Sequence, residues 1–278
     1  RLGRAFGFHR MMDTLGAIVG PAIAIAVLYS FGVNYNSEDV FMRDSSTTEY
    51  AFRTIFWLSI LPGLAAVLLI ILFVREKIQP SHPDSHKHLL SLSLTNSNFK
   101  KFLIVVSIFT LGNFSNAFII LKIQDVGGSL LNVTTLYLLF NAVYSVSSLP
   151  AGIAADYFGK KRMILSSYIL FSFIYAGFAF AGSQTTVWIL FLLYGIFMGI
   201  SEGQQRAFVA TLLHNNAKGT GYGVYHTITG LVTLPSSFIA GLLWDMKGPQ
   251  ATFLFGTVTA IIASILFLVF FRRRQTVM

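Results

Sequence analysis

The stretch Leu149-Pro150-Ala151-Gly152-Ile153-Ala154-Ala155-Asp156-Tyr157-Phe158-Gly159-Lys160-Lys161-Arg162 decides how this chain is organised. An apolar run ends in Gly-x-x-x-Asp, the chain turns at Gly159, and three cations lead into a second apolar run. Positive charge is concentrated in the cytoplasmic loops of membrane proteins. The stretch therefore predicts a tight cytoplasmic loop between two membrane-spanning helices.

The composition is that of a membrane protein. Of the 278 residues, 54% are hydrophobic and only 11% are charged, whereas a typical soluble domain has about 25% charged residues. Cysteine is absent, which excludes disulfides, thiolate chemistry and cysteine-ligated metal sites. The chain starts at Arg1 without a methionine or a secretory signal, so we expect it to be a fragment.

Eight segments are long and apolar enough to cross a bilayer, whose core needs about 20 mostly apolar residues per helix. We expect spanning helices over residues 12–33, 53–74, 101–121, 130–154, 163–181, 186–208, 221–244 and 250–271. The predicted fold class is all-α, a polytopic membrane protein.

The distribution of cations predicts the orientation. An even number of spans places both chain ends on one side of the membrane, and most of the 20 Lys and Arg residues fall on that side. They are Arg1, Arg4, Arg10, Arg75, Lys77, Lys87, Lys100, Lys101, Lys160, Lys161, Arg162, Arg206, Lys218, Arg272, Arg273 and Arg274. We expect that side to be cytoplasmic and the protein to be multi-pass in the cell (cytoplasmic or inner) membrane. The net charge of +9 then reflects topology, and no nucleic-acid partner is expected.

The longest cytoplasmic segment, residues 75–100, is predicted to be a linker because Pro80 and Pro83 interrupt any helix there. It contains His82, His86 and His88, with Asp84 as their only acidic companion at site spacing. We favour a solvated linker over a metal site, and we expect no metal and no cofactor.

The segment from Gly152 to Arg162 resembles the signature loop of the major facilitator superfamily, Gly-x-x-x-Asp-[Arg/Lys]-x-Gly-[Arg/Lys]-[Arg/Lys]. Tyr157 stands where that family usually has a cation, so a weaker charge pairing is expected there. The resemblance implies a transporter of twelve helices in two six-helix halves. It also implies a gate-latch role for the loop residues Gly152, Asp156, Gly159, Lys160, Lys161 and Arg162. Asp156 is expected to accept hydrogen bonds from the N-terminal end of a neighbouring helix.

An internal repeat predicts the domain boundaries. Phe6-Gly7-Phe8-His9 opens span one, and Tyr222-Gly223-Val224-Tyr225 opens span seven. Transporters are often built from repeated halves, so a six-helix unit is expected to separate these two spans. Residues 1–74 then hold the last two helices of an N-terminal half, 75–100 the central cytoplasmic loop, and 101–278 the C-terminal half. Eight helices of an expected twelve would then be present.

Span one carries the pattern Gly7, Gly16, Gly20 and Pro21. It is similar to the helix-five signature of proton-coupled drug antiporters within the superfamily, although Ala24-Ile25 replaces the Gly pair that continues that signature. The alternative is a packing face with a proline kink, since small residues let neighbouring backbones approach and Pro removes a backbone donor.

Two acids in predicted spans are candidates for function, because a charge in a spanning helix is costly and usually faces protein or water. Asp13 can pair with His9 or Arg10 as an interfacial salt bridge, or act in gating or proton coupling. Glu202 can be satisfied by Arg206 one turn later, or bind a proton or a cationic substrate.

Polar groups on spans three, six and seven complete the candidate set, because the resemblance implies that these helices border a central cavity. His226 is either a structural hydrogen-bonding group or a titrating one. The candidate substrate or proton pathway comprises Asp13, Asn113, Asn116, Tyr194, Glu202, Gln205, Arg206 and His226.

These features predict secondary active transport of a small solute by alternating access, with proton-coupled efflux as the first choice. Import of a metabolite, and a non-transporting receptor or scaffold, are the alternatives. An enzyme is not expected, because no convergent nucleophile, base or metal set is found. The expected partners are the lipid bilayer, a small-molecule substrate and protons, and a monomer is expected.

Overall fold

The computed structural model describes residues 2–31, 45–73, 96–128, 130–213 and 217–271. Its elements are α1 (Leu2–Ser30), α2 (Ser45–Phe73), α4 (Ser97–Gly112), α5 (Ala117–Asp125), α6 (Leu130–Phe158), α7 (Lys160–Phe180), α8 (Gln184–Leu212) and α9 (Lys218–Phe271). Most of the predicted linker 75–100, with its histidines, lies outside the described residues. The all-α polytopic fold is confirmed.

Seven helical stretches among the described residues are long and apolar enough to cross a membrane. The last of them, α9, has 54 residues and contains two helices joined at a kink. Gly248 makes that kink with φ of 80°, a left-handed conformation that glycine adopts readily, and Pro249 follows it. The seventh and eighth predicted spans are therefore both present within α9.

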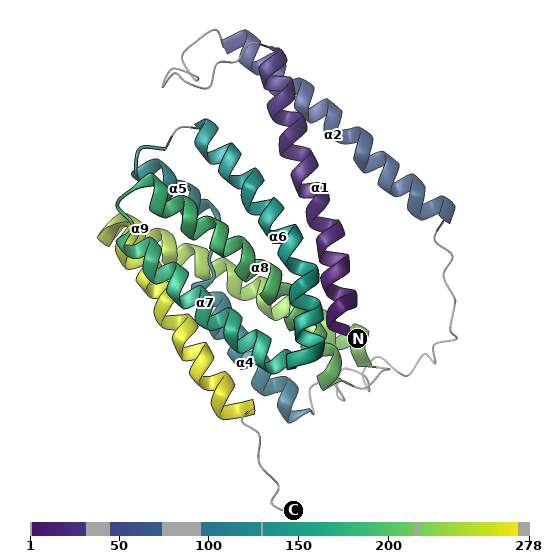
Figure 1. Ribbon diagram of the computed structural model, residues 1–278, viewed down its shortest axis with the longest axis vertical. Helices are drawn as coiled ribbons and strands as arrows, with labels where there is room; N and C mark the ends of the chain where they lie inside the picture. The colour runs from purple at the N-terminus through teal and green to yellow at the C-terminus, as the bar shows by residue number, and fades with distance from the viewer. Residues whose placement is uncertain (1, 32–44, 74–95, 129, 214–216, 272–278) are drawn as a thin grey trace, which may run out of the picture.

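The helices from α4 to α9 form a bundle, and α1 lies along one flank of it with α2 beyond (Figure 1). Helix α1 packs on α6 and α8, while α4 and α7 pack on α9. The bundle core is aromatic: Phe109 of α4 stacks on Tyr168 of α7 and meets Phe171 of α7 edge to face. By contrast, Ala51 is the only buried residue on α2 among its described side chains.

Several predicted boundaries were wrong. Helix α1 begins at Leu2, about three turns before the predicted start at residue 12, because Arg4 and Arg10 are accommodated in the helix. The predicted signature loop is also mostly helical. Gly152 and Asp156 belong to α6 and Lys160 belongs to α7, so only Gly159, with φ of 92°, lies between the two helices.

The cation distribution also needs a correction. Arg10 and Arg206, assigned above to cytoplasmic segments, lie inside α1 and α8. The bias of the remaining cations still favours the same side.

Candidate functional site

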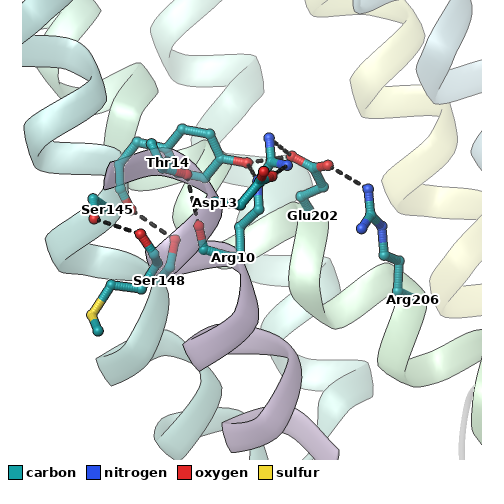
Figure 2. A network of polar contacts seen from close by, with 9 residues as sticks. Arg10, Asp13, Thr14, Ser145, Ser148, Glu202 and Arg206 are labelled. Carbon is teal, nitrogen blue, oxygen red and sulfur yellow. Dashed lines mark hydrogen bonds and ion pairs between the residues drawn. The ribbon is translucent and has the colours of Figure 1, made fainter. Parts of the chain in front are cut away.

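Glu202 on α8 lies at the centre of a charged cluster that connects two helices (Figure 2). Its Oε1 accepts from Arg206 Nη2 at 2.8 Å, one turn along the same helix. Its Oε2 pairs with Arg10 Nη2 of α1 at 2.7 Å. The carboxylate is therefore held between two guanidinium groups, one of which comes from a different helix.

Tyr144 of α6 adds a third helix to this arrangement. Its hydroxyl accepts a hydrogen bond from Arg10 Nε and donates one to Glu202 Oε2. The Arg10 guanidinium also lies 4.9 Å from the centre of the Tyr144 ring, within range of a cation–π contact. Hereafter, the Glu202 cluster means Arg10, Asp13, Tyr144, Glu202 and Arg206.

Asp13 balances the charge of the cluster. Its Oδ2 pairs with Arg10 Nη1 at 2.5 Å, so the predicted interfacial pairing with Arg10 is present. Two arginines thus face two carboxylates, and local neutrality lowers the cost of placing charges in a membrane protein. The Asp13 side chain is 55% exposed, whereas that of Glu202 is 26% exposed.

Small residues on α8 allow α1 and α6 to come close to Glu202. A Cβ added at Gly199 would lie 2.2 Å from Ser147 Oγ, and one at Gly195 would lie 2.9 Å from the Phe140 carbonyl oxygen. The backbone of Phe6 lies 3.6 Å from the corresponding position at Gly203. This close approach brings the Arg10 and Tyr144 side chains to one carboxylate.

Gln205 lies outside the Glu202 cluster. It is buried, accepts a hydrogen bond from the Tyr225 hydroxyl at 2.8 Å, and donates to Ser201 Oγ at 2.7 Å. Tyr222 donates to the Arg206 backbone carbonyl at 2.9 Å. These bonds join α8 to α9, and the side-chain bonds of Gln205 go to Tyr225 and Ser201.

His226 is exposed on α9. Within the part of the chain that the structure describes, its side chain makes no hydrogen bond or ion pair, and its ring contacts the ring of Tyr225 at 5.0 Å between centroids. It is thus an exposed polar group that makes no direct bond to the Glu202 cluster, although the charges of Arg206 and Glu202 both act on it.

Asn113 and Asn116 lie in the break between α4 and α5. The Tyr194 hydroxyl of α8 is directed at the Oδ1 atoms of both, at 3.2 Å and 2.9 Å. The predicted polar segment of span three is thus an interrupted helix whose side chains reach α8. Such breaks occur where protein groups can satisfy the freed backbone.

Asp156 contacts the N-terminal end of α1. Its Oδ1 accepts from the Gly3 backbone N–H at 3.0 Å and its Oδ2 from the Arg4 N–H at 2.9 Å. A carboxylate at a helix N-terminus is favoured by the macrodipole and by otherwise unpaired N–H groups. The sequence anticipated this kind of contact without identifying the helix involved.

Just beside Asp156, α1 and α6 touch backbone to backbone. A Cβ added at Gly152 would lie 2.4 Å from the Gly3 carbonyl oxygen, and one at Gly7 would lie 2.5 Å from that of Ser148. Apart from the adjoining residues and backbone of α1 itself, no described atom lies within 4 Å of such a Cβ at Gly16 or Gly20. Pro21 continues within α1. Of the three helix-five-like glycines, only Gly7 therefore meets another helix closely in the described part of the chain.

The remaining signature residues, together with Tyr157, line a cavity at the ends of the helices. Tyr157 is 84% exposed and packs edge-on against Phe158. Lys160, Lys161 and Arg162 line this cavity, which also reaches the ends of α8 and α9.

Arg10 and Tyr144 were not among the predicted site residues. Arg10 was placed in a loop because span one was started at residue 12, yet no proline interrupts the chain between Leu2 and Met12. Its spacing of three from Asp13 was the available signal. Tyr144 is one of several aromatic residues in span four, and nothing in its local sequence distinguishes it.

Comparison with known proteins places these features in context. The family model described as Major Facilitator Superfamily matches residues 1–120 and 102–278. The chain is 34% identical over 276 residues to an uncharacterised MFS-type transporter of Methanocaldococcus jannaschii, covering 96% of this chain and 64% of that protein. It is 25% identical over 254 residues to an uncharacterised protein of Mycobacterium tuberculosis, covering 88% and 57%. The chain thus spans less than two thirds of the length of these curated relatives.

Two solved structures have a similar fold. The crystal structure of the MFS transporter FucP in the outward conformation matches with a TM-score of 0.70 and 16% identity, covering 98% of this chain and 69% of that one. A variant of the Escherichia coli fucose:proton symporter FucP matches with a TM-score of 0.68 and 15% identity, covering 95% and 67%. At these identities the similarity concerns the fold.

Proposed function

The chain belongs to the major facilitator superfamily, and from that premise we propose that it forms part of a secondary active transporter that moves a small solute by alternating access. In this proposal α1 and α2 are the last two helices of a first six-helix half, and α4 to α9 form the second half. The repeated segments support this division, because each lies four residues after the start of its helix, α1 or α9.

The contacts of α1 then become contacts between halves. Gly3, Gly7 and Gly152 bring the two backbones together at the end of the bundle where Asp156 accepts from α1. The cation bias supports a cytoplasmic position for that end. This arrangement corresponds to a transporter closed at its cytoplasmic end, and the similarity to outward-facing FucP supports it.

One observation carries the proposed coupling: the Glu202 carboxylate is held by Arg206 of its own helix and by Arg10 across the interface, at 2.8 Å and 2.7 Å. Protonation of Glu202 removes the charge that attracts Arg10, so the bond between the halves depends on the protonation state. Binding energy that differs between two states shifts their populations. We assign Glu202 as the proton-coupling group and Arg10 as its partner across the interface.

The test is Glu202→Gln in the complete transporter that contains this chain, reconstituted in proteoliposomes. A panel of small solutes first identifies one that the unaltered protein moves under a pH gradient. The variant should lose gradient-driven accumulation of that solute yet retain downhill exchange, because the amide cannot exchange a proton. Asp245→Asn, an equivalent change at an exposed acid of α9, is the matched control. Gradient-driven transport that persists in Glu202→Gln would remove Glu202 from the coupling step.

For direction, we propose proton-coupled efflux, supported by the helix-five-like residues Gly7, Gly16, Gly20 and Pro21. Everted vesicles test it, since an exporter accumulates solute inside them when their lumen is acidic. Accumulation in right-side-out vesicles with an outwardly acidic gradient would instead establish import. If the chain is a scaffold, no solute of the panel moves in either preparation.

A further inference from the structure

A cavity of about 750 Å³ lies where the ends of α7, α8 and α9 meet. Its lining divides into two chemically different parts. The mouth carries Lys160, Lys161 and Arg162 of α7, and the wall carries Phe208, Phe267 and Phe271 of α8 and α9. These three phenylalanines are nearly fully buried within the protein. We propose that this cavity is a binding site for an anionic phospholipid, with the phosphate at the cations and an acyl chain along the apolar wall.

The charge at the mouth favours an anion. Among the described residues, no carboxylate lies within 4 Å of the side-chain nitrogens of Lys160, Lys161 or Arg162. Asp156 is the one acid in the lining, and both of its carboxylate oxygens are occupied by the N–H groups of Gly3 and Arg4. Three cations therefore face the cavity with their charges uncompensated by the described ion pairs.

The Lys161 side chain lies against the aromatic wall of the cavity. Its Nζ lies 5.6 Å from the centre of the Phe271 ring, within the range of a cation–π contact. This places one ammonium group at the boundary between the charged mouth and the aromatic wall. A phosphate and the first methylenes of a lipid present the matching pair of surfaces.

The apolar wall continues toward the membrane centre, which favours a lipid over a free phosphate. Leu268 lines the cavity. Ile265 and Ile261 lie one and two helical turns before it in α9, farther from the end of the helix. These three side chains are between 45% and 54% exposed. Because residues at such spacing share one helix face, they provide a continuous track for an acyl chain.

The depth of the cavity along the helices also suits a phospholipid headgroup. The cavity lies at the first turn of α7 and the last turn of α9, where both spans end. Anionic lipid headgroups attract basic residues at this level, by about 1 kcal/mol for each Lys or Arg near the surface.

Native mass spectrometry of the delipidated, complete protein tests the site, with phosphatidylglycerol and phosphatidylcholine offered at equal concentration. The unaltered protein should retain phosphatidylglycerol preferentially. Lys161→Gln should weaken that retention about fivefold, and the triple change Lys160→Gln, Lys161→Gln, Arg162→Gln about a hundredfold, as expected for one and three charges. Lys100→Gln, an exposed cation of α4 outside the cavity, should leave it unchanged.

Further measurements distinguish a bound lipid from the other possible occupants of the cavity. Leu268→Trp narrows the track without changing charge and should also weaken phosphatidylglycerol retention. Equal retention of both lipids, or full retention by the folded triple variant, would overturn the proposal. Displacement of phosphatidylglycerol by equimolar inorganic phosphate would show a simple anion site instead. If retention requires removal of residues 272–278, that segment fills the cavity and the lipid assignment is wrong.

Discussion

Arg10 shows how a single side chain can hold an interface together. Its three guanidinium nitrogens each have a separate partner: Nε donates to Tyr144, Nη1 to Asp13, and Nη2 to Glu202. The planar fork of arginine makes such divergent bonding possible, whereas the lysine ammonium is a single point charge. The guanidinium geometry at position 10 therefore matters as much as the charge.

Arg10→Lys is predicted to destabilise the protein although it conserves charge. Lysine cannot serve three acceptors in different directions, and the partly buried groups left unpaired should cost about 2 kcal/mol. The measurement is the thermal unfolding midpoint in detergent. Arg4→Lys is the control, because the described hydrogen bond of Arg4 uses its backbone N–H and its side chain is exposed. Equal effects of both changes would show that the fork of Arg10 has no special role.

At the level of the helices, α1 is joined to α6 by two different kinds of contact. The glycines Gly3, Gly7 and Gly152 allow the two backbones to touch, and Asp156 binds the first N–H groups of α1. Close contact without side chains gives a packed crossing that a small separation would break.

Gly152→Ala is predicted to open the crossing of α1 and α6. The new methyl group would lie 2.4 Å from the Gly3 carbonyl oxygen, a backbone atom that cannot rotate away. Overpacking of this kind costs about 1–3 kcal/mol, which exceeds the gain of about 1 kcal/mol in helix propensity. A cysteine introduced at Ser148, which is buried beside Gly7, reports the opening through faster maleimide labelling.

Gly241→Ala provides the matched control for this experiment. Gly241 is also helical, and its added Cβ would meet only Phe118 at an ordinary 3.9 Å. Labelling at Ser148→Cys should be unchanged by Gly241→Ala. If Gly152→Ala leaves the labelling rate equally unchanged, the backbone contact does not determine the closed state.

For the whole molecule, the decisive property is its orientation in the membrane. The turn at Gly159, two residues after Tyr157, and the turn around Gly182 lie at opposite ends of α7. The three cations that follow Gly159 favour the cytoplasm for the first turn, and therefore the opposite side for the second.

Cysteine labelling tests this orientation, and the natural absence of cysteine leaves no background. With a membrane-impermeant maleimide, Gly182→Cys should react in intact cells, and Tyr157→Cys only after the membrane is opened. Tyr157 is 84% exposed, so lack of access to the protein surface cannot explain its protection. Both variants should react after detergent solubilisation. The reverse pattern would invert the orientation and make the α1–α6 crossing an extracellular closure.

The fold was largely predictable, since hydrophobic runs of bilayer length leave few alternatives for the backbone in lipid. The errors concerned helix ends and breaks. Charged residues did not end α1, because Arg10 finds partners on α6 and α8. Gly248 joins two predicted spans, while the break at Asn113 to Asn116 divides one predicted span into α4 and α5.

Within the site, contacts along one helix could be predicted from residue spacing, whereas contacts between helices could not. The pairs Glu202–Arg206 and Arg10–Asp13 follow from helical periodicity alone. The sequence by itself determined that the chain is an all-helical membrane protein with a basic turn after Asp156, because hydropathy and charge act locally along the chain. Only the tertiary structure decided that Arg10 and Tyr144 meet Glu202 and that Asp156 binds the start of α1. Those contacts depend on which helix faces approach each other, and the glycines that permit the approach do not specify their partners.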